Sequence, residues 1–453
     1  MSVTAVLLCG GTGLDADVVT GPAVVVVDEL CDSPSAGVAA MRKLGADRVV
    51  LGLCKGRSHS DVVAALQRAG AGPFAVETVI VDGLDRHDAA RFLAAATAKI
   101  GALAPDERGK TVIARGGISR RALFSIAGAA TQVPVAVLTE AACVGSKRCG
   151  LCADVCPDGA VDLSGRLPHI DTGRCSACGR CVPGCPHSAL RLAGSATAQT
   201  EAQLEELLSG VPGIVFACSS AHAEVPQAWA LVKLPSLALV TPGWILQSRL
   251  RGVEVRLVPC AGTCCSGVSN VEALANHLLS LCDPPEGTEG PVLLREPLAT
   301  ADAVARLVPR EEKVVIRDEA APLGVLTLAT EGCTLCGACG TACPTGALRL
   351  DENERETILR FEPDACVGCG RCAATCPESV LEAVRGIDFT RVGRGAVELV
   401  RVGVETCDTC GNRLPPPAMQ RRLRELLPEL AEAPLGLCAA CAHRVGVTPA
   451  ARV

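Results

Sequence analysis

The strongest constraint on this chain is a repeated run of four cysteines followed by proline, in the spacing C-x2-C-x2-C-x3-C-P. Three complete copies begin at Cys175, Cys333 and Cys366. This is the ligand spacing of 4Fe–4S clusters, in which three closely spaced thiolates hold one cluster and the fourth cysteine reaches another cluster. Because such a cluster carries one electron at a time, the runs predict electron transfer.

The runs predict two dicluster modules of the bacterial ferredoxin type, over residues 143–192 and 331–385. In such a module the fourth cysteine of each run ligates the cluster of the neighbouring run. Three of the four resulting ligand sets keep the regular cysteine spacing. They are Cys175, Cys178, Cys181 with Cys156; Cys333, Cys336, Cys339 with Cys376; and Cys366, Cys369, Cys372 with Cys343. The proline after each distal cysteine fixes φ, and small residues between the ligands let backbone N–H groups approach the cluster sulfides.

The fourth run is irregular. Ser146 stands where its first cysteine is expected, and five residues separate Cys143 from Cys149. The expected ligands of this cluster are Cys149, Cys152, Cys185 and Cys143. Either the loop bulges to bring Cys143 to the cluster, or the centre is of the 3Fe–4S type. We favour the bulge, since a cysteine is within reach.

The first part of the chain, residues 1–142, is expected to be a parallel α/β domain followed by a linker. Strand-like runs at 3–8, 23–27, 48–53 and 74–81 alternate with helix-like stretches at 36–44, 60–69 and 86–100. Cys9, Cys31 and Cys54 each follow such a strand. Since the carboxyl ends of parallel strands share one edge, the three thiols should converge there. They either hold a further cluster or act as small buried hydrophobes.

Residues 211–283 predict a second, smaller α/β unit. Its expected strands are 213–217, 238–241 and 254–259, with a helix over 270–281. A cluster here would use Cys218, Cys260, Cys264 and either Cys265 or Cys282. The alternative is a relic domain whose cysteines bind nothing.

The C-terminal segment, residues 400–450, carries two C-x2-C knuckles around a helix-like stretch at 419–427. The cysteines are Cys407, Cys410, Cys438 and Cys441. Four thiolates from two knuckles suit tetrahedral zinc, so a zinc-ribbon-like site is expected, with a structural role or a role in docking a partner. Mononuclear iron would use the same ligands.

The N-terminal domain resembles that of the heterodisulfide reductase A family. The similarity lies in residues 6–10, the turn at 31–34, the run 47–54 with His59 after it, and residues 69–74. It implies that Cys9, Cys31 and Cys54 ligate an iron–sulfur cluster. The flavin domain of that family should follow, but residues 114–118 lack the later glycine of a G-x-G-x-x-G fingerprint, so no flavin is expected.

The 211–283 unit is similar to the delta subunit of methyl-viologen-reducing hydrogenase. The matching residues are 215–218 and 255–262, followed by Cys264 and Cys265. This resemblance implies a 2Fe–2S cluster. Ser219 and Ser220 follow Cys218, where that family has paired cysteines near the first strand.

The charge and the aromatic content of the chain bear on which partners it can bind. The net charge is −6 with mixed signs, and the chain has six Phe, two Trp and no Tyr, which argues against nucleic-acid partners. Neither a signal peptide nor an apolar stretch of membrane-spanning length is visible, so a soluble cytoplasmic protein is expected.

These features predict a non-catalytic subunit that relays single electrons between partner subunits of a multi-subunit oxidoreductase. The expected partners are hydrogenase, formate dehydrogenase or heterodisulfide-reductase-like subunits, or a soluble ferredoxin. Catalytic residues are not identified, because no triad, nucleotide loop or open metal site with a general base is visible. The alternatives are a redox enzyme whose open-site cluster acts on a disulfide-like substrate, and an iron–sulfur scaffold or redox sensor.

Overall fold

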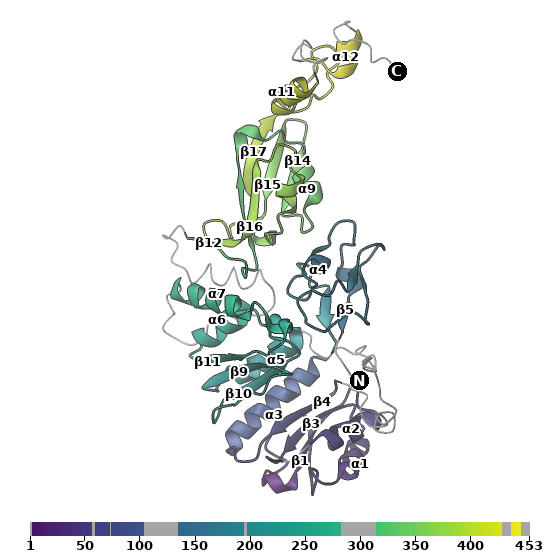
Figure 1. Ribbon diagram of the computed structural model, residues 1–453, viewed down its shortest axis with the longest axis vertical. Helices are drawn as coiled ribbons and strands as arrows, with labels where there is room; N and C mark the ends of the chain where they lie inside the picture. Colours follow the sequence, from purple (N-terminus) through teal and green to yellow (C-terminus); the bar gives the residue numbers. More distant parts are fainter. Residues whose placement is uncertain are drawn as a thin grey trace. The chain divides into compact units, whose positions relative to one another are not determined.

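The computed structural model describes residues 2–56, 59–72, 74–103, 135–193, 197–281, 314–427 and 436–444 (Figure 1). The described chain divides into two compact units, one running to Leu279 and one containing residues 314–427 and 436–444. No helix within these ranges is both long and apolar enough to cross a membrane.

A parallel sheet with the strand order β2-β1-β3-β4 forms the N-terminal domain. Its strands are β1 Thr4–Cys9, β2 Ala23–Val27, β3 Arg48–Leu53 and β4 Val76–Ile80. Helices α1 Pro34–Leu44 and α2 Ser60–Arg68 share one core with the sheet, and α3 Arg86–Gly101 shares a second core with it. The predicted alternation of strands and helices is confirmed, because buried apolar faces on both sides of a sheet require helices on both sides.

The first unit contains a second α/β domain, which packs onto α3. Helix α5 Thr197–Leu207 lies along α3, between the first sheet and a second parallel sheet (Figure 1). That sheet has the order β10-β9-β11, with β9 Gly213–Cys218, β10 Ala230–Leu234 and β11 Glu254–Val258. Helices α6 Pro242–Leu250 and α7 Val268–Leu281 accompany it.

The prediction of a strand at 238–241 is wrong. Leu237–Leu239 forms a 3-10 helix, and Thr241 caps α6 by accepting a hydrogen bond from the Trp244 N–H at 3.2 Å. Pro242 occupies the first turn of α6, where a missing N–H costs nothing. The third strand of this sheet is instead β10.

The first cysteine-rich module lies in the same unit. Its strands pair as β5 Ala136–Leu138 with β8 Leu190–Leu192, and β6 Val161–Asp162 with β7 His169–Ile170; its helix is α4 Leu151–Asp154. Leu190 and Leu192 belong to the hydrophobic core that also contains Phe216 and Leu239. The module therefore shares its core with the second sheet.

The second unit holds the other cysteine-rich module between two antiparallel sheets, ordered β12-β16-β13 and β14-β15-β17. The strands are β12 Val315–Arg317, β13 Gly324–Leu328, β14 Leu348–Glu352, β15 Glu356–Phe361, β16 Leu381–Asp388 and β17 Val397–Gly403. The helices are α9 Ala338–Ala342, α10 Arg371–Thr375, α11 Pro417–Leu426 and α12 Ala439–Arg444. The helix expected at 419–427 is thus present as α11.

Candidate metal centres

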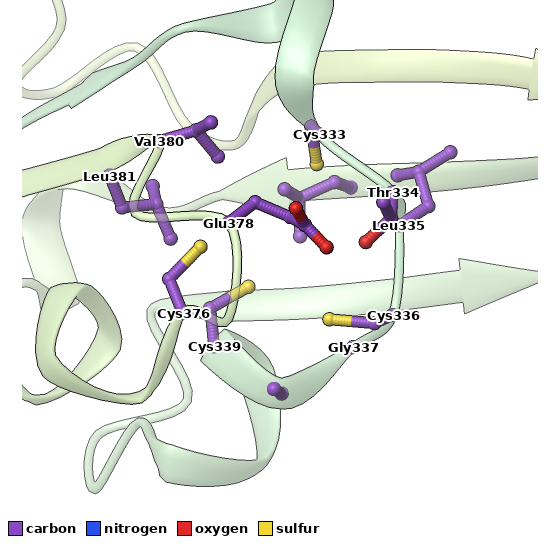
Figure 2. Close-up of a pocket in the computed structure, with 12 residues that line it drawn as sticks. Cys333, Thr334, Leu335, Cys336, Gly337, Cys339, Cys376, Glu378, Val380 and Leu381 are labelled. Atoms are coloured by element: carbon purple, nitrogen blue, oxygen red, sulfur yellow. The ribbon is translucent and has the colours of Figure 1, made fainter. Parts of the chain in front are cut away.

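Three cavities are each lined by one of the regular ligand sets. One cavity is lined by Cys333, Cys336, Cys339 and Cys376 (Figure 2). A second is lined by Cys343, Cys366, Cys369 and Cys372. The third is lined by Cys156, Cys175, Cys178 and Cys181. Each cavity therefore brings three cysteines of one run together with the distal cysteine of another, and four soft thiols suit iron.

The three loops around these cavities have one backbone conformation. After the first cysteine, the second and fourth residues both have positive φ. The φ values are 61° and 75° at Ala177 and Gly179, 54° and 76° at Leu335 and Gly337, and 62° and 72° at Gly368 and Gly370. For a non-glycine residue this left-handed conformation costs roughly 1–2 kcal/mol. The same conformation at Ala177 and Leu335 indicates that the loop path is imposed by what the loop surrounds.

All four distal cysteines make the same turn. The third residue after each one has positive φ, and its N–H donates to the carbonyl oxygen of that cysteine. These residues are Gly159, Ser188, Gly346 and Ser379, with N–H to oxygen distances of 3.3, 3.2, 3.4 and 3.2 Å. The next N–H, of Ala160 and Ala189, donates to the sulfur of Cys156 and Cys185 at 3.3 Å. Hydrogen bonds to the ligand sulfurs are one of the factors that set the potential of an iron–sulfur cluster.

Cys143 has the backbone setting of the first cysteine of a regular run, despite its displacement in sequence. A 3-10 helix directly precedes Cys143, as one also precedes Cys333 and Cys366. The φ and ψ of these three cysteines are −84° and 127°, −76° and 117°, and −82° and 125°. The five residues between Cys143 and Cys149, three more than in a regular run, include a turn with Gly145 at a φ of 91°. Cys149 and Cys185 lie near Cys152 and contribute to its raised pKa, after burial.

Burial opposes ionisation of the cavity thiols. Burial first, and neighbouring thiols second, raise the pKa of Cys181 to about 12. Burial likewise raises the pKa of Cys339, Cys366 and Cys372 to about 11 in each case. Buried thiols that resist losing a proton to water become thiolates when a bound metal supplies the positive charge, so the donor set fits a metal cluster.

The N-terminal sheet brings Cys9, Cys31 and Cys54 together at the carboxyl edge of its strands. Their sulfur atoms all lie within 4.8 Å of one another. A Cβ added at Gly11 would lie 3.2 Å from the Cys54 sulfur, so a glycine is what lets the backbone approach the thiols. Within the described part of the chain, no fourth cysteine, histidine or acidic side chain joins this group, and His59 lies outside it.

The second sheet brings together Cys218, Cys260, Cys264 and Cys265, whose sulfurs also lie within 4.8 Å of one another. The sulfur of Cys260 is 3.1 Å from that of Cys264 and 3.6 Å from that of Cys265. The geometry therefore favours Cys265 over Cys282 as the fourth member, and Cys282 lies outside the described residues. Four thiols at this separation suit one metal ion or a small cluster.

The C-terminal knuckles converge as well. The sulfurs of Cys407, Cys410, Cys438 and Cys441 lie within 4.8 Å of one another. The Cys438 N–H donates to the Cys407 sulfur at 3.3 Å, and this bond is the main cause that lowers the pKa of Cys407 to about 6. A thiolate already favoured by a backbone donor fits a tetrahedral zinc site.

The first module and the middle cysteine group are joined by close packing. A Cβ at Gly179, beside Cys178, would lie 3.0 Å from the Leu239 side chain. Leu239 belongs to the 3-10 helix that follows Ser236, and the Ser236 hydroxyl donates to the Cys264 carbonyl oxygen at 2.7 Å. A short protein path thus connects these two candidate centres. Ser236 and Leu239 were not predicted from the sequence, because nothing in the cysteine spacing points to them.

Comparison with known families supports iron–sulfur chemistry. Residues 332–380 and 358–412 each match a 4Fe–4S dicluster domain, and residues 168–191 match a 4Fe–4S binding domain. These matches contain the three regular runs, whereas Cys143–Cys156 lies outside them. No curated protein matches the chain, so the two resemblances to redox-complex subunits remain predictions. The chain thus contains ferredoxin-type 4Fe–4S domains within a mixed α/β multidomain fold, which supports an iron–sulfur electron-transfer role.

Proposed function

We propose that this chain relays single electrons through four 4Fe–4S clusters as a subunit of a larger oxidoreductase. The observation that carries this proposal is the set of three similar cavities, each lined by the four cysteines that the crossover of distal ligands requires. A bound cluster would accept and release one electron, while the protein fixes its thiolates and limits its contact with water.

The fourth cluster would be held by Cys149, Cys152, Cys185 and Cys143. Its support is the turn shared by all four distal cysteines and the placement of Cys143 after a 3-10 helix. The three-thiol and four-thiol groups of the first unit would hold additional iron–sulfur centres, and the C-terminal group would hold zinc. The two family resemblances favour a heterodisulfide-reductase-like or hydrogenase-like complex, with the partner subunits supplying catalysis.

The test is anaerobic reconstitution of the full chain with iron and sulfide, followed by reductive titration monitored by EPR. We expect reversible one-electron transitions and no turnover of a substrate by the chain alone. A chain that binds only zinc, or that gives no reversible EPR signal, would overturn the proposal.

A second candidate function rests on the group at Cys9, Cys31 and Cys54. Three thiols without a fourth partner in the described chain would leave one iron of a cluster open to an outside ligand. Such a centre could act on a disulfide-like substrate. A Cys54→Ala variant with unchanged iron content would remove this candidate, whereas a thiol-induced change in the EPR spectrum that the variant loses would support it.

A further inference from the structure

The second residue after three of the distal cysteines lines the same cavity as that cysteine. These residues are Asp158, Thr345 and Glu378, which follow Cys156-Pro157, Cys343-Pro344 and Cys376-Pro377. The backbone turn is common to them, but the side chains differ in charge. This position therefore places a carboxylate beside two of the candidate clusters and a neutral hydroxyl beside the third.

Glu378 is the longest of these side chains and extends into its cavity. Figure 2 shows its carboxylate directed into the space bounded by Cys333, Cys336 and Cys376. The side chain is only 16% exposed, so water screens its charge weakly. The carboxylate also contributes to the raised pKa of Cys333, after burial and the neighbouring thiols. A negative charge at this place opposes the arrival of a further electron in the cavity.

The positive charge facing Glu378 comes from the C-terminal segment. Arg422 Nε, on α11, lies 3.0 Å from Glu378 Oε2 as an ion pair that is not aligned as a hydrogen bond. Arg422 also donates to Glu425 at 3.0 Å. Because the guanidinium is always charged, it offsets the carboxylate whenever α11 is in place.

Helix α11 is held in place by the segment that contains the C-terminal cysteine group. The Gln420 amide donates to Glu405 at 3.0 Å and to the Pro415 carbonyl oxygen at 2.8 Å. Arg413 donates to the carbonyl oxygen of Asn353, next to β14, at 2.8 Å. The position of Arg422 therefore depends on how the segment between the two cysteine knuckles is seated on the module.

We propose that Glu378 and Arg422 form a charge pair that sets the reduction potential of the cluster at Cys333, Cys336, Cys339 and Cys376, and that the C-terminal segment acts on this cluster through Arg422. The proposal rests on the proposed function, since it requires the cluster. Net charge near a cluster is one of the factors that set its potential. Glu378 and Arg422 would act on the cluster through their charges and are not its ligands.

The test uses the full chain, reconstituted and titrated with a low-potential reductant under EPR. Removing the carboxylate in Glu378→Gln should raise the reduction equilibrium constant of one cluster roughly tenfold, about 59 mV for one electron. Removing the guanidinium in Arg422→Gln should lower it by a similar factor. Arg422→Lys, which keeps the charge, should stay near the wild-type value.

Arg421→Gln is the matched control, because Arg421 is exposed and carries the same charge one residue away on the same helix. It should leave every transition unchanged. If Glu378→Gln assembles poorly, Arg422→Gln carries the test alone, since Arg422 does not line the cavity. Full iron content with unchanged transitions in Arg422→Gln, or an equal shift in Arg421→Gln, would overturn the proposal. A wild-type chain without reversible transitions would instead overturn the proposed function.

Discussion

Gly324 tests whether close packing against the sheet holds the loop of Cys366 and Cys369 in place around its cavity. An added Cβ at Gly324 would lie 2.3 Å from the backbone nitrogen of Gly368 and 2.7 Å from the sulfur of Cys366. Gly324 pairs with Arg385 across β13 and β16, and a Cβ at Gly368 would lie 2.7 Å from the Arg385 backbone nitrogen. The loop of Cys366 and Cys369 thus lies against bare backbone of the sheet, with no room for a methyl group.

Gly324→Ala must therefore push this loop away from the sheet. Overpacking of this kind costs about 1–3 kcal/mol, which corresponds to a roughly 5- to 150-fold larger population of the displaced loop. Iron release to a ferrous chelator requires the loop to open, so we expect one cluster to lose iron faster by about that factor. The assay is anaerobic chelation followed by absorbance, with EPR to identify the cluster that is lost.

Gly403→Ala is the control, because an added Cβ there would meet only the Arg355 carbonyl oxygen at 3.9 Å. It should release iron at the wild-type rate. If Gly324→Ala and Gly403→Ala release iron at the same rate, the packing argument is wrong.

Three further predictions concern other parts of the chain. The Arg48 guanidinium donates to the carbonyl oxygens of Ile100, Gly101 and Leu103 at 3.1, 2.8 and 2.7 Å. Arg48→Met should therefore lower the free energy of unfolding of the N-terminal domain by about 2 kcal/mol. Urea unfolding followed by circular dichroism measures this, and an unchanged midpoint would refute it. Because the pKa of Cys181 is raised from 9.0 to about 12, the folded apo-protein holds this proton more tightly than the unfolded chain, so its stability should fall as pH rises from 9 towards 12. Urea midpoints across that range should fall in the apo-protein, and constant midpoints would contradict the argument. Cys441→Ser should remove one bound zinc per chain without changing the cluster signals, as measured by metal analysis and EPR; retained zinc, or iron in its place, would contradict the zinc assignment.

The sequence predicted those strands and helices that depend on the pattern of a few neighbouring residues. The strands at 23–27 and 48–53 lie where runs of apolar, β-branched residues predicted them, both at the exposed edge of the sheet and in its buried interior. The strand expected at 238–241 failed because an apolar run cannot distinguish a strand from a buried 3-10 turn. Thr241 before Pro242 was the available signal, as threonine caps helices and proline favours their first turn.

The same limit applies to the candidate sites. Cysteine spacing predicted which residues line each cavity, because the loop that wraps a cluster is encoded within a few residues. The residues that pack against these loops come from distant parts of the chain, so the sequence of the loop itself does not indicate them. Gly324 and Arg422 are such residues, since one packs under a loop from a strand and the other approaches a cavity from α11.

The exchange of distal cysteines between runs is the central claim, and EPR of single-cysteine variants tests it most directly. In the full reconstituted chain, Cys376→Ser should alter the signal that Cys336→Ser alters, because both sulfurs line one cavity. It should leave intact the signal that Cys369→Ser alters, although Cys376 and Cys369 belong to the same sequence run. If Cys376→Ser instead alters the signal that depends on Cys369, each run holds its own cluster and the account is contradicted.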